Sequence, residues 1–288
     1  MLKEELEDRH IAGNWWIWLI AILGMAVATR LYFLPYDLPP VMDGVDYFAY
    51  SLEIRNLGEL PKNWPLGNNG WPSFMGLLFS IIPSEEFLDY VNFYRISSVI
   101  ISTITIIPIY FISSKFFGKH LGLLGAALFA FEPRLMINST MIMNEPIFIL
   151  LITLIILLFF YRNSKNLIIV FGLIALATHI RYESLIFIIP ASILFFLNSG
   201  KDFKDFQKYF LAIFVFLIIL IPFLALNYFA TGQDGISNHY LSAIIQDYDQ
   251  LVESDFSNNV YLNEKIDDKN YDYVVNGLSN GIKFLGYS

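Results

Sequence analysis

The sequence contains no cysteine and few charged side chains. Only 15% of its 288 residues are Asp, Glu, Lys or Arg, compared with about 25% in soluble domains. The absence of cysteine excludes disulfides, thiolate metal sites and thiol nucleophiles. Its 18 basic residues are outnumbered by 26 acidic ones, for a net charge of −8. Because nucleic-acid phosphates are bound by clustered Lys and Arg, we expect no nucleic-acid partner.

Hydrophobic side chains are abundant, at 56% of the chain. A helix that crosses the roughly 30 Å hydrocarbon layer of a membrane needs roughly 20 mainly apolar residues. We therefore predict an all-α, polytopic membrane helix bundle that packs against lipid. We expect about seven spans, several of them short, at residues 14–34, 91–113, 121–131, 146–161, 167–180, 185–197 and 209–230.

The loops between these spans differ in their content of Lys and Arg. Short loops on the cytoplasmic side of a membrane are enriched in basic residues. This rule predicts a multi-pass protein of the cytoplasmic membrane with its N-terminus inside. The outer loops then carry most of the acidic residues. The basic residues of the predicted inner loops are Lys115, Lys119, Arg162, Lys165, Lys201, Lys204 and Lys208.

Two longer segments lie on the predicted outer side. Residues 35–90 form an outer loop that bears surface helices, one of which ends at Gly58. Residues 71–83 are apolar, but counting them as a span would reverse every later loop, so we expect a short helix in the outer interface. Residues 1–230 then form one transmembrane module. Residues 231–288 form an extracytoplasmic polar tail, or the start of a truncated C-terminal module.

Two acidic residues open the first outer helix. Asp43 and Asp46 are three positions apart, so on a helix their carboxylates face the same way. Such a pair can bind a divalent cation or supply a general base. The alternative is structural, with Asp43 capping the helix and Asp46 in its first turn, where the helix dipole favours anions.

Three further sites carry charge at the ends of spans. Glu145 begins a span between Asn144 and Pro146, where the alternative is a capping sequence. Arg181 and Glu183 interrupt an apolar stretch, and charges there are costly unless they are paired or functional; a surface ion pair is the alternative. An arginine at the outer start of another span, Arg95, either holds phosphate or anchors the helix end at the lipid headgroups.

The order of these features resembles the GT-C membrane glycosyltransferases. In particular, it resembles the branch with dolichyl-phosphate-mannose protein mannosyltransferases and aminoarabinose transferases. It rests on the first span, the acidic outer loop, an Arg-led span, the Lys115–Lys119 loop, the acid at Glu145 and the Arg181–Glu183 break. This resemblance implies a GT-C module. It also implies an inverting enzyme that moves a sugar from a polyprenyl-phosphate donor to an acceptor hydroxyl outside the cytoplasm.

The resemblance also implies roles for single residues. The family's first-loop and second-loop acids fall on Asp43 and Glu145, and Arg181 would lie near the donor phosphate. We expect Asp43 to be the general base with Asp46 assisting, and Glu145 to orient the sugar. Asp43 and Glu145 are the candidate ligands if a divalent cation such as Mg²⁺ or Mn²⁺ takes part. The expected catalytic residues are Asp43, Asp46 and Glu145, and the expected substrate-binding residues are Arg95, Arg181, Glu183, Tyr47 and Tyr50.

The sequence departs from this family in three places. Relatives have adjacent Asp-Glu in the first loop, whereas here Gly44 and Val45 separate two aspartates. Gly70-Trp71-Pro72 stands for a His-Pro-Pro element, and a large soluble domain between later spans is absent. The acceptor, whether glycan, lipid or protein, therefore stays open. A lipid-linked sugar transporter or flippase and a non-catalytic membrane assembly subunit are the alternative functions.

Overall fold

A computed structural model describes residues 14–232, except positions 63, 65, 85, 162–163 and 199–202. These residues belong to the first of the two units into which the chain divides, Met1–Ile236. Within them every regular element is helical. Residues 1–13, the predicted inner-loop residues Arg162 and Lys201, and the predicted tail beyond Gly232 lie outside the described residues.

Three helices are long and apolar enough to cross a membrane by length and composition. They are α2 (Trp15–Tyr32), α5 (Phe87–Ala130) and residues Phe206–Thr231 of α10 (Phe203–Thr231). All three coincide with predicted spans. Helix α5 is interrupted at Gly118, whose φ of 82° and ψ of 171° are not helical, so its two halves correspond to the separate segments predicted on either side.

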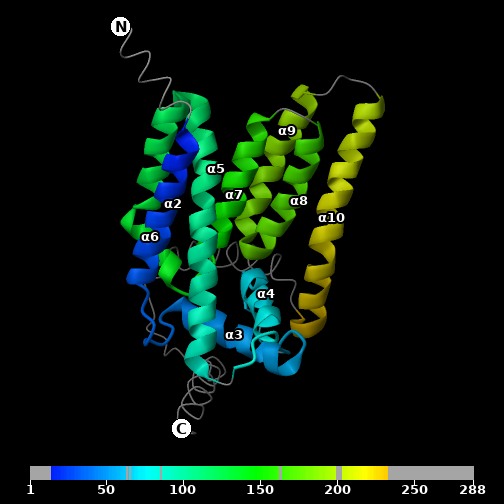
Figure 1. Ribbon diagram of the computed structural model, residues 1–288. Coiled ribbons are helices and arrows are strands. Elements are labelled where there is room, and N and C mark those ends of the chain that lie inside the picture. Colours follow the sequence, from blue (N-terminus) through cyan, green and yellow to red (C-terminus); the bar gives the residue numbers. More distant parts are fainter. Residues whose placement is uncertain are drawn as a thin grey trace, which may run out of the picture. The chain divides into compact units, whose positions relative to one another are not determined.

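Three shorter apolar helices lie beside these long helices in the bundle (Figure 1). Helix α7 is Glu145–Phe160, α8 is Ser164–Ile180 and α9 is Ile188–Asn198, preceded by the 3₁₀ turn η1 (Tyr182–Phe187). Helix α8 packs against α7, α9 and α10 and contributes most of its own apolar side chains to the main core. An all-helical membrane protein is thus confirmed, and the number of spans stays a prediction.

Two helices of the outer loop lie together at one end of the bundle (Figure 1). Helix α3 is Asp43–Leu57 and ends at Gly58 in the left-handed conformation, as the sequence predicts. Helix α4 is Gly70–Phe79, a ten-residue helix that begins one residue before the predicted range 71–83 and ends within it. The alternative in which Asp43 caps this helix is wrong. Met42 is the N-cap, and Asp43 and Asp46 both lie in the first turn.

A further helix, α6 (Pro133–Thr140), was not predicted by the sequence and packs against α5, α7 and α2. Glu132 caps it by accepting a 2.6 Å hydrogen bond from the Leu135 amide. The segment is too short and too polar for a hydropathy signal, so it reads as a loop in the sequence.

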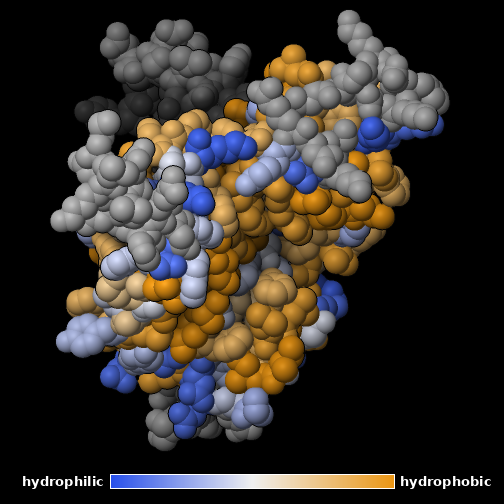
Figure 2. All heavy atoms as spheres, turned by 45° about the horizontal axis from the view of Figure 1, so that its top comes forward, coloured by the Kyte–Doolittle hydropathy of each residue, from blue (hydrophilic) through white to orange (hydrophobic). Residues whose placement is uncertain are grey.

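Hydrophobic side chains cover most of the visible face of the molecule (Figure 2). They include large exposed residues on helices with apolar spans, such as Trp18, Phe210 and Phe214. Monomeric soluble proteins rarely expose apolar surface on this scale. The lipid-facing surface follows from the sequence because α2 and α10 are apolar on nearly all sides.

Candidate functional site

Four helix ends meet where α3 and α4 approach the lower ends of α7 and α8 (Figure 1). A Cβ placed on Gly44 of α3 would lie 2.9 Å from the Ile142 carbonyl oxygen, just before α7. One placed on Gly70 of α4 would lie 2.4 Å from the His179 carbonyl oxygen, at the end of α8. Only glycine permits such approaches of one backbone to another. The glycines therefore bring the outer-loop helices against the ends of the spans that carry Glu145 and Arg181.

Glu145 and Arg181 form an ion pair at this convergence. Glu145 is the first residue of α7, and Arg181 is the residue that separates α8 from η1. Nη1 of Arg181 lies 3.4 Å from Oε1 of Glu145, and its Nη2 lies 3.4 Å from Oε1 of Glu183. The side chains of Glu145 and Arg181 are 34% and 35% exposed. The pair is therefore open to a ligand as well as structural.

The aspartates of α3, Asp43 and Asp46, interact electrostatically with a tyrosine at the same site. Burial is the largest cause that raises the pKa of the Tyr47 hydroxyl, and Asp43, Glu145 and Asp46 raise it further while Arg181 lowers it. Burial and, after it, the neighbouring Asp43 raise the pKa of Asp46. Tyr47 thus lies within the electrostatic range of every acidic residue that the sequence predicts to be catalytic. Its hydroxyl stays protonated at neutral pH and can donate a hydrogen bond.

The side chain of Asn144 does not cap α7, the alternative role that the sequence left open. Asn144 occupies the N-cap position but makes no side-chain capping bond. Its amide instead donates a 2.8 Å hydrogen bond to the Asn68 carbonyl, which ties the start of α7 to the turn before α4. Helix α7 is consequently fixed in register with the outer loop, and Glu145 with it.

Arg95 and Tyr50 have contacts that differ from those of the other predicted site residues. Arg95 is 2% exposed, and its guanidinium donates to the carbonyls of Pro35, Leu38 and Pro39 at 2.6, 2.8 and 3.1 Å. Tyr50 is fully buried and its hydroxyl accepts a 2.9 Å hydrogen bond from the Asn69 amide. These contacts hold the outer loop, and a role for either residue in substrate binding stays untested.

Sequence reasoning missed a second arginine with an unusual environment. Arg30 of α2 is fully buried, and its Nε donates a 3.1 Å hydrogen bond to Ser139 of α6. The signal was an arginine inside an apolar span, which is costly unless it is satisfied by a neighbour. Since α6 leads into the segment before Glu145, this bond helps to fix the position of that segment.

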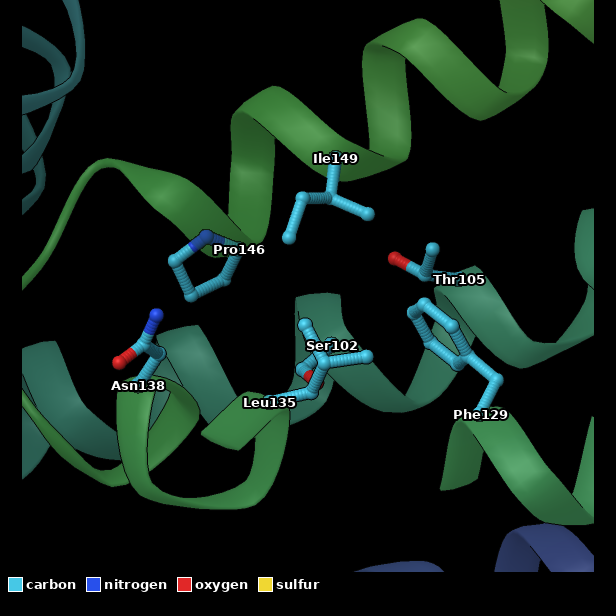
Figure 3. A pocket seen from close by; sticks show the side chains of 7 residues that line it. All are labelled: Ser102, Thr105, Phe129, Leu135, Asn138, Pro146 and Ile149. Carbon is cyan, nitrogen blue, oxygen red and sulfur yellow. The ribbon is translucent and has the colours of Figure 1, made fainter. Parts of the chain in front are cut away.

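A small cavity lies behind Glu145, between α5, α6 and α7 (Figure 3). Pro146 and Ile149 of α7 face Ser102 and Thr105 of α5 across it, with Asn138 of α6 at its edge. It is too small for a sugar, so it is not the substrate site. The Thr105 hydroxyl donates to the Ile101 carbonyl at 2.8 Å, as threonines of buried helices commonly do.

The expected metal ligands do not form a metal centre within the described residues. There, no group of three His, Asp or Glu side chains is placed to hold a metal ion. Asp43 and Glu145 would contribute two carboxylates, and Mg²⁺ can be held by one or two carboxylates together with water and substrate phosphates. A divalent cation therefore stays a prediction, and we derive no chemical step from one.

The decisive comparison with known proteins concerns the spans rather than the outer loop. Residues 89–226 match the family model of dolichyl-phosphate-mannose-protein mannosyltransferase. The resemblance to this mannosyltransferase family is thereby confirmed over that segment, which includes Arg95, Glu145, Arg181 and Glu183. The match and the apolar helices indicate a membrane glycosyltransferase of the GT-C type. No curated protein matches the chain.

The mannosyltransferase match does not reach every predicted site residue. Asp43, Asp46, Tyr47 and Tyr50 precede the matched segment. Their connection to the family rests on the resemblance of the outer loop and on the contacts that join α3 to the start of α7. The family implies a lipid-linked sugar donor and an acceptor.

Proposed function

We propose that the protein is an inverting glycosyltransferase that moves a sugar from a polyprenyl-phosphate donor to an acceptor hydroxyl. The observation that carries the proposal is the convergence of Asp43, Glu145 and Arg181 around Tyr47. It joins a proton acceptor, a group that can orient a sugar and a cation for phosphate. These are the groups that transfer from a phosphate-activated sugar requires.

Asp43 is the general base in this proposal. It is exposed at the start of α3, where an acceptor hydroxyl can reach it. The acceptor oxygen attacks the anomeric carbon, and its proton passes to the Asp43 carboxylate. The bond between that carbon and the phosphate oxygen breaks, and polyprenyl phosphate leaves with the electron pair. Attack opposite the leaving group inverts the anomeric configuration. Asp46, whose pKa is raised by burial and by Asp43, assists.

Arg181 holds the phosphate and Glu145 orients the sugar. A guanidinium binds phosphate oxygens through parallel hydrogen bonds, and its charge stabilises the departing phosphate. Arg181 is partly exposed and bonded to two carboxylates at 3.4 Å, distances long enough for a phosphate to replace one of them. Arg95 acts indirectly in this scheme. Its guanidinium donates hydrogen bonds to the carbonyls of the loop that leads to Asp43, and so fixes the position of that loop.

The site lies on the extracytoplasmic face in this proposal, in the cytoplasmic membrane. The basic residues Lys115 and Lys119 flank the interruption of α5, and Lys208 lies in the first turns of α10. These parts of the chain are at the end of the bundle away from α3 and α4 (Figure 1). Basic residues mark the cytoplasmic side, so α3, α4 and the site face outward.

The alternatives fit these observations less well. A transporter or flippase requires ionisable residues along a path through the middle of the membrane. The charged predicted site residues instead collect at helix ends, and the family match is to transferases. An assembly subunit without catalysis would have no use for an exposed base beside an ion pair.

A direct assay tests this function. Purified full-length protein is incubated with a set of polyprenyl-phosphate sugars and candidate glycan, lipid and protein acceptors. We expect release of polyprenyl phosphate together with a sugar-acceptor product of inverted anomeric configuration. Movement of the intact sugar lipid between leaflets without release of polyprenyl phosphate would instead identify a flippase, and neither outcome would identify a non-catalytic subunit.

A further inference from the structure

The hydroxyl of Tyr94 is buried and lacks a hydrogen-bond partner in the described part of the chain. Tyr94 lies near the start of α5 and is 0% exposed. Its ring meets Trp71 and Phe79 of α4 edge-on, at centroid distances of 6.0 and 6.3 Å. Because these rings hold Tyr94 in place, its hydroxyl cannot turn toward water. Buried hydroxyls are nearly always bonded, so this one calls for a partner.

Glu145 has a carboxylate oxygen to which no described residue donates a hydrogen bond. Its Oε1 faces Arg181, whereas its Oε2 is buried and has no partner among the described residues. An ionised carboxylate only accepts hydrogen bonds, and a tyrosine hydroxyl can donate one. Tyr94 belongs to the core cluster against which Phe148 of α7 packs, three residues after Glu145, because α5 and α7 lie against each other. Glu145 and Tyr47 are also close enough to Tyr94 to interact with it electrostatically. An unused donor and an unused acceptor therefore lie in the same part of the site.

On the basis of the proposed function, we propose that Tyr94 is a positioning residue for Glu145. When the sugar donor is bound, the Tyr94 hydroxyl donates to Oε2 of Glu145 while Arg181 turns toward the phosphate. The carboxylate is then held by α5 in place of Arg181, in the orientation that the sugar requires. Hydrogen bonds of this kind are often long in an empty site and shorten when substrate binds. Tyr94 is too deeply buried to touch the sugar itself.

The structure of the full chain with bound donor tests this directly. The probe is dolichyl phosphate mannose in lipid nanodiscs, and the measured quantity is the distance from Tyr94 Oη to Glu145 Oε2. We expect about 2.5–3.0 Å, the range of a hydroxyl-to-carboxylate bond. A distance above about 4 Å beside a bound donor, or an Oε2 bonded to Ser184 instead, would overturn the inference. A donor found away from Glu145 and Arg181 would contradict the proposed function itself.

Kinetics provides the second test. Tyr94→Phe removes one oxygen and keeps the ring, and Tyr110→Phe removes the equivalent oxygen from another buried tyrosine of α5. Tyr110 stacks on Trp15 in a separate core cluster, about 24 Å along the helix from Tyr94. We expect Tyr94→Phe to lower kcat about 10-fold with the donor KM nearly unchanged, because the carboxylate is misplaced rather than the donor unbound. Tyr110→Phe should change neither constant.

Two outcomes of the kinetic comparison count against the inference. An unchanged kcat in Tyr94→Phe would show that Glu145 needs no donor from α5. Equal losses of kcat in both variants, each accompanied by an equal fall in melting temperature, would show a general loss of packing. An inactive wild-type protein would contradict the proposed function, which separates that failure from either result.

Discussion

The guanidinium of Arg181 contacts the carboxylate of Glu145, although 36 residues separate them in the chain. Nη1 and Oε1 are 3.4 Å apart, and both side chains remain about one third exposed. Because exposed ion pairs contribute little to stability, this contact adds little to the free energy of folding. In the proposed mechanism the arginine holds the phosphate of the donor and the carboxylate orients its sugar.

Replacing Arg181 tests the phosphate contact. Arg181→Gln removes the positive charge and leaves a shorter polar side chain, so it should weaken the binding of dolichyl phosphate about 10- to 100-fold, the effect of losing a charged hydrogen bond. Arg134→Gln, at an exposed arginine of α6, is the control and should bind normally. Both are measured as Kd in nanodiscs. Equal affinities in Arg181→Gln and wild type would remove Arg181 from the phosphate site.

Arg95 should behave differently from Arg181. A lysine at position 95 cannot reach three carbonyls at once, so Arg95→Lys should lower the free energy of unfolding by at least about 2 kcal/mol. The Kd for dolichyl phosphate should change little at temperatures where the variant is folded. Thermal unfolding in detergent and the same binding assay check this. A normal melting temperature together with weakened phosphate binding would instead support a direct contact between Arg95 and the donor.

Several features of this fold could be predicted from the sequence because they depend on local physics. Apolar runs long enough to span lipid locate α2, the first half of α5 and α10. The stop of α3 at Gly58 follows from the left-handed conformation that glycine adopts readily. The sequence also singled out Glu145 and Arg181, because charges next to apolar spans are costly and call for a partner.

Contacts between distant segments could not be predicted in the same way. Gly118 has a φ of 82° and forms the turn between the halves of α5. Tyr94 and Arg30 lie inside apolar spans, and nothing in their spacing shows which neighbours face them. The alternative in which Asp43 caps its helix was wrong because Met42 precedes it as N-cap, a position where side-chain chemistry alone favours aspartate.

The contact between α4 and α8 predicts the effect of a single methyl group. In Gly70→Ala the new Cβ would lie 2.4 Å from the His179 carbonyl oxygen, and neither backbone can move away easily. We expect a loss of about 1–3 kcal/mol in unfolding free energy. Gly67→Ala is the matched control, because its Cβ would have nothing within 4 Å. A melting temperature of Gly70→Ala equal to that of the control would contradict the close approach.

The paired aspartates of α3 predict a pH-dependent stability. Burial and Asp43 raise the pKa of Asp46, so the folded state binds this proton more tightly than the unfolded state. Protonation of Asp46 therefore stabilises the fold at low pH, and this contribution is lost as pH rises through the raised pKa. Asp46→Asn removes the partly buried charge and its repulsion by Asp43, and should stabilise the protein at pH 7. Because Asp46 is largely exposed, solvent limits the gain to about 0.2–0.5 kcal/mol.

The gain in Asp46→Asn should shrink as pH falls through the raised pKa and disappear about one unit below the unfolded value of about 3.9, where the aspartate is protonated in both states. Melting temperatures between about pH 3 and pH 8 measure it, with Asp37→Asn as a control at an exposed residue of the preceding loop. A stabilisation that is equally large at both ends of this range would mean that the charge of Asp46 is not its cause.

The most direct test of the account is the turnover of Asp43→Asn. The amide keeps the size of the side chain at the start of α3 but cannot accept the acceptor's proton. Release of polyprenyl phosphate, measured with the donor and acceptor on which the wild type is active, should fall about 100-fold or more. The melting temperature of the variant should equal that of the wild type, and the control Asp37→Asn should keep wild-type turnover. Full turnover in a folded Asp43→Asn protein would contradict the claim that the first-loop aspartate is the catalytic base.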